Sequence, residues 1–467
     1  MRNVLFVSLG CDKNLVDSEK MLGLLNEAGY HVAQEESEAD AIVVNTCCFI
    51  HDAKEESVET ILEMAEWKKK GTLKALIVTG CMAQRYQEEI QQEIPEVDAV
   101  IGTTGYTEIV PILDEILDAA EASQTKDLTE TEEQKEKSFV NCCPSIDLLP
   151  ASLADKRVVT TGGYTAYLKI AEGCNKRCTY CIIPYIRGHY RSFPMEDLLE
   201  EARKLAESGV NELILIAQET TVYGMDCYGR KALPELLTKL CEIEGIEWIR
   251  ILYCYPEEIT DELIAVMKKE KKICHYLDIP IQHSEDTILK RMGRRTNREE
   301  LVSLVEKLRK EIPDIILRTT LITGFPGETE QEFNNMVDFV DSMEFDRLGV
   351  FPYSVEEGTK AAEMDHQIAE DVKESRRDEI MALQQEISAA KAESRIGQEM
   401  SVLIEGYLYE DDIYIGRTYM DAPKVDGNVF VRAEEELISG DMVPVRITGA
   451  SEYDLMGDVI YADEFTE

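Results

Sequence analysis

Strand-length apolar runs alternate with amphipathic, helix-length stretches through most of this chain. In the first 140 residues the strand-like runs are "NVLFVSLGC", "ADAIVVNTCCF", "LKALIVTGC" and "VDAVIG". The first two helical stretches carry apolar faces formed by Met21, Leu22, Leu25, Ala28 and by Val58, Ile61, Leu62, Ala65. Strands that alternate with helices are typical of a parallel sheet covered by helices on both faces. The sequence therefore predicts an open parallel α/β sheet at the amino terminus.

The same alternation continues from residue 161 to residue 397 with six further strand-like runs. They are "YTAYLKIA", "ELILIAQ", "WIRILYCY", "HYLDIPIQ", "IILRTTLITG" and "RLGVFPYS". Six successive β-α units predict an incomplete (β/α)6 barrel whose functional groups lie at the carboxyl ends of the strands.

Two other regions complete the predicted organisation. Residues 121 to about 160 include "EASQTKDLTETEEQKEKS", which is charged and lacks apolar periodicity, so we expect an exposed loop or linker there. After residue 398, short alternating runs separated by glycines indicate a small antiparallel β-barrel. The expected domains are residues 1–140, a linker at 141–160, residues 161–397 and residues 398–467.

Composition narrows the class of protein. Of 467 residues, 44% are hydrophobic and 30% are charged, which suits globular domains. The apolar runs are too short to span a bilayer, and the stretch "MRNVLFVSLGCDKN" lacks a small-residue cleavage site, so we expect no signal peptide and a cytoplasmic protein without a membrane partner. The 13 cysteines then favour metal ligation or redox chemistry over a disulfide framework.

Three of these cysteines each follow a predicted strand of the amino-terminal sheet. Cys11, Cys47 and Cys81 stand directly after an apolar run. The carboxyl ends of parallel strands lie on one edge of the sheet, where such sheets bind ligands. We therefore expect the three thiols to converge, although unrelated buried cysteines would also fit the pattern.

A second cysteine group follows the first strand of the predicted barrel. Cys174, Cys178 and Cys181 form a CxxxCxxC pattern in "EGCNKRCTYC". Thiolates select iron–sulfur clusters, zinc or cuprous copper. A structural zinc site and an electron-transfer cluster each need four protein ligands. Three thiolates on a four-iron cluster would leave one iron open to a small molecule.

CxxxCxxC after the first strand of a (β/α)6 pattern resembles the radical S-adenosylmethionine superfamily. Nearly the whole chain further resembles its methylthiotransferase branch, through "SLGCDKNLVDSE", "NTCCFI" and "VTGCMAQRY". The resemblance implies two [4Fe-4S] clusters, one on Cys174, Cys178 and Cys181 and one on Cys11, Cys47 and Cys81. It also implies that S-adenosylmethionine serves both as methyl donor and as radical source, that a flavodoxin or ferredoxin supplies electrons, and that the last domain is a TRAM domain.

Within this branch the chain is most similar to the RimO type. The matching stretches are "CTYCIIPYIRG", "IAQETTVYG", "LDIPIQH", "LRTTLITGFPGE", "FDRLGVFPYS" and "MDAPKVDG". This resemblance implies methylthiolation at the β-carbon of an aspartyl residue of small-subunit ribosomal protein 12. The alternative is a methylthiotransferase that acts on adenosine of transfer RNA.

Charge bears on that choice of substrate. The chain has 92 acidic and 49 basic residues, a formal charge of −43. Residues 398–467 contain seventeen acidic residues and four basic ones, Arg417, Lys424, Arg432 and Arg446. Such a surface repels a phosphate backbone and attracts a basic protein. We expect a basic protein substrate and no sequence-specific binding of nucleic acid.

Other residues are weaker candidates. Near the predicted barrel mouth, Gln218, Glu219, Gln282, His283, Arg318 and the turn "GFPGE" (324–328) could contact S-adenosylmethionine, but ordinary loop hydrogen bonding explains each of them equally well. Asp421 and Asp426 could meet a basic substrate or simply form turns. We expect the remaining cysteines to be reduced structural or surface thiols: Cys48, Cys142, Cys143, Cys227, Cys241, Cys254 and Cys274. Cys48 is the alternative ligand to its neighbour Cys47, although the position in the motif favours Cys47. Two further hypotheses, a non-catalytic iron–sulfur carrier and a zinc-bearing scaffold, leave the three-thiolate loop unexplained.

Overall fold

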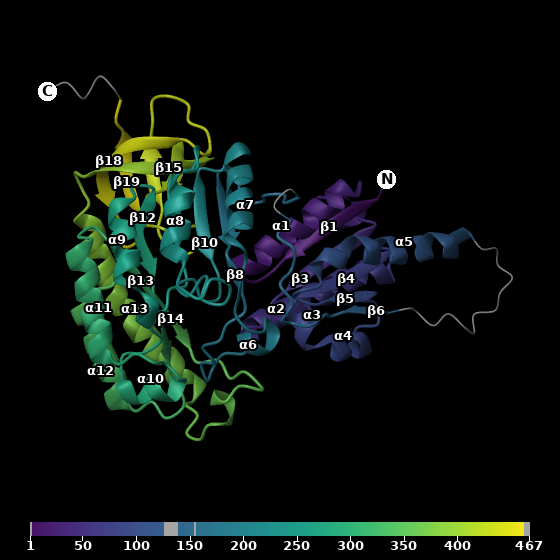
Figure 1. Cartoon of the computed structure of the whole chain (residues 1–467), viewed down its shortest axis with the longest axis horizontal. Helices are drawn as coiled ribbons and strands as arrows, with labels where there is room; N and C mark the ends of the chain where they lie inside the picture. Colours follow the sequence, from purple (N-terminus) through teal and green to yellow (C-terminus); the bar gives the residue numbers. More distant parts are fainter. Residues whose placement is uncertain (1, 126–138, 154–155, 462–467) are drawn as a thin grey trace. The chain divides into compact units, whose positions relative to one another are not determined.

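The computed structural model of this chain describes residues 2–125, 139–153 and 156–461 (Figure 1). The described chain divides into two compact units. One contains residues 1–160, 171–201 and 354–359, and the other contains residues 161–170, 202–353 and 360–467. Part of the charged segment, residues 126–138, lies outside the described residues.

The first unit is built on a parallel sheet in the order β2-β1-β3-β4-β5-β6. The strands are β1 (Asn3–Ser8), β2 (His31–Val32), β3 (Ala41–Thr46), β4 (Ala75–Gly80), β5 (Ala99–Ile101) and β6 (Val140–Cys142). The helices are α1 (Asp12–Glu27), α2 (His51–Lys69), α3 (Cys81–Arg85), α4 (Gln87–Glu93) and α5 (Ile109–Thr125). The predicted α/β sheet is confirmed. The loop expected from residue 121 to about 160 begins later than predicted, because α5 runs to Thr125, and β6 interrupts it as a sixth strand of the sheet.

Helices cover both faces of this sheet. Val43 and Ile77 join a core with α1 and α5, whereas Ile42 and Val78 join a second core with α2, α3 and α4. Strands that are buried on both faces are continuously apolar, as "AIVV" and "ALIV" are. The predicted apolar face of α2 is partly wrong, because Ser57, Ile61, Met64 and Ala65 are the buried positions and Val58 and Leu62 are exposed.

The second unit contains six parallel strands in the order β14-β13-β12-β11-β10-β7. They are β7 (Thr165–Lys169), β10 (Glu212–Ile216), β11 (Trp248–Ile251), β12 (Ile273–Asp278), β13 (Ile316–Thr323) and β14 (Arg347–Pro352). The alternating helices are α8 (Leu233–Cys241), α9 (Asp261–Lys269), α10 (Asp286–Met292), α11 (Arg298–Glu311) and α12 (Glu330–Met343), which flank the sheet in Figure 1. The predicted open (β/α)6 arrangement is confirmed.

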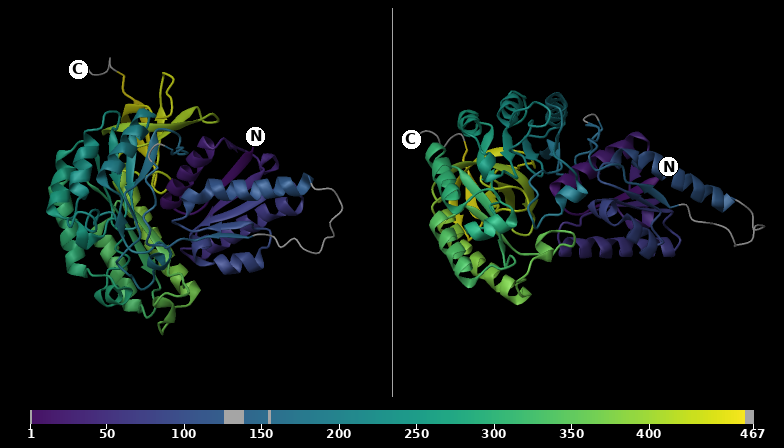
Figure 2. Two further views of the ribbon diagram at one scale, coloured as in Figure 1. Left: turned by 45° about the vertical axis from the view of Figure 1, so that its right-hand side comes forward. Right: turned by 60° about the horizontal axis from the view of Figure 1, so that its bottom comes forward.

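Helix α13 (Glu370–Glu393) packs on β13 and β14 and leads into a closed barrel ordered β15-β16-β17-β19-β18, drawn in yellow in Figure 2. Its strands are β15 (Glu399–Leu408), β16 (Ile413–Arg417), β17 (Val429–Arg432), β18 (Met442–Ala450) and β19 (Leu455–Val459). The sequence prediction missed β19, and β17 pairs with β19 in parallel rather than antiparallel fashion. Among the described residues, no helix combines the length and hydropathy that crossing a bilayer requires.

Candidate cluster-binding sites

The structure brings Cys11, Cys47 and Cys81 to one edge of the amino-terminal sheet. Cys11 precedes α1, Cys47 follows β3, and Cys81 opens α3 directly after β4. Because β1, β3 and β4 are neighbours in a parallel sheet, their carboxyl ends lie side by side. Cys47 and Cys81 are buried and Cys11 is exposed. The edge therefore presents three thiols, one of them open to solvent.

Gly10 allows the backbone just before Cys11 to pack closely against Cys47 at this edge of the sheet. Gly10 has a φ of 86°, and a Cβ placed on it would lie 2.6 Å from the Cβ of Cys47. Only glycine adopts this conformation readily, and only glycine leaves room for the neighbouring cysteine. Gly10 thus lets the Cys11 loop lie directly against Cys47.

Electrostatics separate Cys47 from its neighbour Cys48. Burial, with smaller contributions from the nearby sulfurs of Cys81 and Cys11, raises the pKa of Cys47 to about 12. Burial also raises the pKa of Cys48, whose charged neighbours are Cys81, Arg85 and Cys47. Cys48 packs with Ile61 and Met82 in the core beneath the sheet. Both thiols are buried and both interact with Cys81, but the electrostatic neighbours of Cys47 also include Cys11.

The second group of thiols lies in the loop that follows β7. Cys174 and Cys178 are buried and Cys181 is partly buried. The amide of Cys174 donates to the carbonyl of Gly188 (3.1 Å), and the amide of Lys176 donates to Cys174 Sγ (3.5 Å). Arg177 has a φ of 54°, so the loop holds a non-glycine residue in a left-handed conformation. Such conformations are typical of ligand-binding loops.

The donor set of each group suits an iron–sulfur cluster. Each group consists of three soft sulfur donors, which such clusters select. In a cluster every thiolate binds its own iron, so the sulfurs need not meet at one point. Among the described residues, no three His, Cys, Asp or Glu side chains are placed to hold a single metal ion.

Helix α1 buries much of its polar face, which the sequence prediction missed. Asn14, Asp17, Glu19 and Lys20 are each at most 4% exposed. The partners come from distant parts of the chain: Glu19 binds Arg157 and Lys20 binds Glu201. Arg187, which follows the CxxxCxxC loop, binds Asp17 at 2.9 Å. The one signal in the sequence was the polar run "DKNLVDSEK", in which charged residues occupy every face of a predicted helix.

The carboxyl ends of β10 and β12 carry several of the predicted mouth residues. Gln218 and Glu219 follow β10, and Gln282 and His283 follow β12. Gln282 has a φ of 72°, an uncommon conformation for a residue with a side chain. Within the described part of the chain, the buried atoms Gln218 Oε1 and Ser284 Oγ make no hydrogen bond. Orphaned polar atoms at strand carboxyl ends are suited to binding a polar cosubstrate.

His283 and the "GFPGE" turn are connected through Glu328. The carboxylate of Glu328 accepts from the amide of Gly324 (2.9 Å) and pairs with Arg376 at 2.7 Å. His283 Nε2 lies 3.4 Å from the same carboxylate, and its Nδ1 accepts from the amide of Glu285. Glu328 therefore stabilises the turn by binding the amide at its start.

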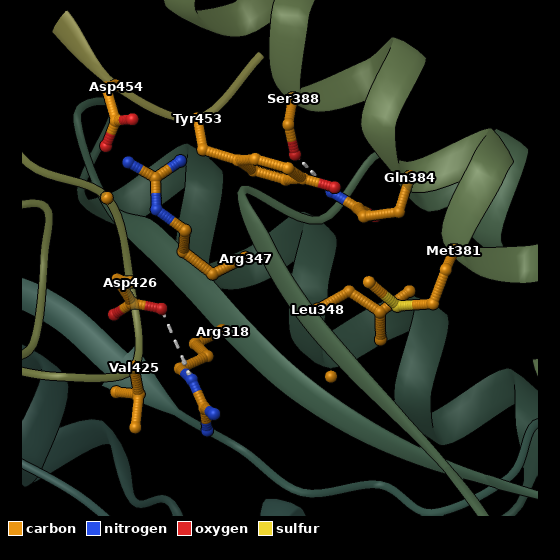
Figure 3. A pocket seen from close by; sticks show the side chains of 12 residues that line it. Arg318, Arg347, Leu348, Met381, Gln384, Ser388, Val425, Asp426, Tyr453 and Asp454 are labelled. Carbon is orange, nitrogen blue, oxygen red and sulfur yellow. Dashed lines mark hydrogen bonds and ion pairs between the residues drawn. The ribbon is translucent and has the colours of Figure 1, made fainter.

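Arg318, Asp421 and Asp426 do not belong to the mouth. Arg318 is the third residue of β13, and its guanidinium pairs with Asp278 (2.8 Å) and Asp426 (3.4 Å). Asp421 pairs with Arg347 at 2.5 Å. Figure 3 shows Arg318 and Asp426 beside a cavity of about 430 Å³ that Gln384 also lines. The motif "MDAPKVDG" thus binds the small barrel to strands of its own unit, because its two aspartates form ion pairs with Arg347 and Arg318.

All thirteen cysteines are free thiols, as the sequence predicts. Cys142 ends β6 and Cys143 follows it, and Cys254 and Cys274 are buried in the second unit.

Comparison with known proteins identifies three family segments. Residues 3–102 match the Uncharacterized protein family UPF0004, residues 168–340 match the Radical SAM superfamily, and residues 396–460 match the TRAM domain. A protein of Lachnoclostridium phytofermentans named ribosomal protein uS12 methylthiotransferase RimO is 62% identical over 97% of this chain and 99% of its own length. The chain belongs to the RimO methylthiotransferase family.

Other RimO relatives agree over the full length. The RimO protein of Clostridioides difficile is 50% identical over 99% of both chains, and that of Acetivibrio thermocellus is 51% identical over 98% of both. Among solved structures, the radical S-adenosylmethionine methyltransferase TsrM of Kitasatospora setae matches 75% of this chain and 73% of its own, with 15% identity and a TM-score of 0.51. That likeness supports the radical S-adenosylmethionine fold. As a member of this family, the chain is an iron–sulfur enzyme that uses S-adenosylmethionine.

Proposed function

We propose that this protein transfers a methylthio group to the β-carbon of an aspartyl residue of ribosomal protein uS12, using two [4Fe-4S] clusters. The observation that carries the proposal is the presence of two separate three-thiol groups. Cys11, Cys47 and Cys81 would hold one cluster, and Cys174, Cys178 and Cys181 would hold the other. When bound, the clusters would supply sulfur and the reducing electron that S-adenosylmethionine cleavage requires.

The chain itself would bind and orient these groups. Thiolates are the ligands of iron, so loading must remove a proton from each buried thiol. For Cys47 that proton is held tightly, because burial raises its pKa to about 12. Gln218 and Ser284, with their orphaned buried atoms, would orient S-adenosylmethionine at the barrel mouth.

The substrate proposal is supported by the distribution of charge in the TRAM domain. Of its four basic residues, Arg417 is 1% exposed and pairs with Glu212 and Glu405. Arg446 pairs with Glu399 on the surface. The carboxylates Glu434, Glu435 and Glu436 are exposed. A domain with this surface favours a basic protein over transfer RNA, which is the alternative substrate class.

The remaining parts of the proposal follow from the expected organisation. The domains would be residues 1–140, a linker at 141–160, residues 161–397 and residues 398–467, except that β6 extends the first domain to Cys142. A flavodoxin or ferredoxin would donate electrons, and the enzyme would work in the cytoplasm on uS12 alone or within a ribosomal subunit.

Single-cysteine variants test the cluster assignment. After anaerobic reconstitution, the parent protein should hold iron and sulfide for two clusters. C47S should lose about half of both, whereas the matched variant C48S should keep them. Equal losses in the two variants, or losses in C48S alone, would show that the ligand of the first group is assigned wrongly.

A further inference from the structure

Arg187 is a buried guanidinium that contacts Cys81 and the segments next to Cys11 and the CxxxCxxC loop. It follows α6 (Ile183–Ile186), directly after the CxxxCxxC loop, and is 2% exposed. Its Nη1 lies 2.9 Å from Asp17 Oδ2 and 3.2 Å from Glu172 Oε1. Its Nη2 donates to Asn14 Oδ1 at 2.5 Å.

These partners flank the cysteines in the sequence. Asn14 and Asp17 lie on α1, just after Cys11. Glu172 ends β8 (Ala171–Glu172), just before Cys174. One side chain therefore fixes the amino-terminal cluster segment against the CxxxCxxC segment, within a single compact unit.

Arg187 also contacts a candidate ligand directly. Its Nη2 lies 3.7 Å from Cys81 Sγ, within hydrogen-bonding distance for sulfur. An N–H donor on a ligand sulfur and a nearby positive charge both favour the more negative, reduced form of a cluster. Because Arg187 and Cys81 are both buried, solvent screens this effect weakly.

We propose that Arg187 is a positioning residue that holds Cys81 in place and raises the reduction potential of the amino-terminal cluster through its hydrogen bond to the Cys81 sulfur. The inference rests on the proposed function, in which Cys11, Cys47 and Cys81 bind that cluster. It adds a role for a residue outside both cysteine groups, and it makes the two cluster segments depend on one guanidinium.

Arg157 provides a matched control. It is also a buried guanidinium in the same unit, with side-chain exposure of 2%, and it pairs with Glu19 (2.5 Å) and Glu201 (2.8 Å). Replacing either arginine by glutamine removes a buried positive charge from its carboxylate partners, so both changes should destabilise the apoprotein. The two variants should differ in their effect on the cluster.

The experiment uses the full chain with C174A, C178A and C181A, so that only the amino-terminal cluster loads. The midpoint potential is measured by anaerobic redox titration with electron paramagnetic resonance for this parent and for its R187Q, R187K and R157Q derivatives. We expect R187Q to lower the equilibrium constant for reduction at least tenfold, which is about 59 mV for one electron. R187K should recover part of that shift, and R157Q should match the parent.

The outcomes separate the two proposals. A parent without iron and sulfide would overturn the cluster assignment and the inference with it. A loaded R187Q protein with the potential of the parent would overturn the inference alone. If R187Q holds no cluster while R157Q does, the positioning role is supported, and the potential of R187K then decides the electronic role. An R187K protein with an unchanged potential would refute that electronic role.

Discussion

Glu212 is the residue whose loss should most weaken the second unit. It lies at the start of β10 with no exposed side chain and binds two arginines. Arg417 Nη2 lies 2.7 Å from Glu212 Oε2, and Arg250 Nε lies 3.0 Å from Glu212 Oε1. The substitution Glu212→Gln removes the charge that both guanidinium groups share. It therefore tests whether this buried ion network holds the small barrel on the parallel strands.

The expected magnitude follows from the pKa of Glu212. Burial alone would raise this pKa, but Arg417 and Arg250 lower it from the ordinary value of 4.5 to about 2. At about 1.4 kcal/mol for each tenfold change in proton affinity, the network stabilises the ionised form by roughly 3 kcal/mol. That value is at the lower end of the 3–5 kcal/mol typical of a broken buried pair. The arginines keep other acceptors, because Arg417 also binds Glu405 and Arg250 binds the carbonyl of Tyr419.

Tryptophan fluorescence during urea unfolding measures this loss in the correct unit. The chain has two tryptophans, Trp67 on α2 and Trp248 on β11. A W67F background leaves Trp248 as the reporter of the second unit. With an m-value of about 3 kcal/mol/M, E212Q should lower the urea midpoint by about 1 M.

The matched control is the exposed pair of Arg446 and Glu399, whose side chains are 46% and 50% exposed. E399Q should change the unfolding free energy by less than about 1 kcal/mol. If E212Q and E399Q shifted the midpoint equally, the buried network would not be what holds the two parts together.

Two further predictions concern pH and the cluster edge. The stability that Glu212 provides should be fully present above about pH 4.5 and lost as the pH falls towards 2, because its folded-state pKa is lowered. The difference in unfolding free energy between parent and E212Q should thus narrow as the pH falls from about 4.5 to about 2, and a constant difference would contradict the assigned ionisation. Gly10→Ala places a Cβ 2.6 Å from the Cβ of Cys47, at a residue whose φ is 86°. The iron and sulfide contents after reconstitution should therefore fall to about half. Gly29→Ala is the control that should keep both clusters, because Gly29 also has a positive φ but no atom lies within 4 Å of the added Cβ.

The sequence predicted those features that depend on local pattern. Strands such as "AIVV" and "ALIV" are recognisable because both faces are buried, and the placement of Cys47 and Cys81 follows from where those strands end. The CxxxCxxC pattern of Cys174, Cys178 and Cys181 is likewise local, so it is recognisable from the sequence alone. The predicted α/β sheet, the open barrel and the small carboxyl-terminal barrel followed from the same periodicity.

Features that depend on distant partners could not be predicted in this way. Asp17 on α1 is buried because Arg187 lies opposite it, 170 residues away in the sequence. The aspartates of "MDAPKVDG" have the sequence pattern of exposed turn residues, but their side chains are buried because Arg347 and Arg318 bind them. Strands β6 and β19 are short or rich in polar residues, so they form through pairing with a neighbour rather than through their own periodicity.

An anaerobic turnover experiment with two substrates offered in parallel decides whether the enzyme modifies uS12. Reconstituted protein, reductant and S-adenosylmethionine are incubated anaerobically with uS12 and, in parallel, with bulk transfer RNA, and the products are read by mass spectrometry. We expect a methylthio group on one aspartate of uS12 and unmodified nucleosides. A methylthio group on adenosine, with uS12 unchanged, would show that transfer RNA is the substrate instead.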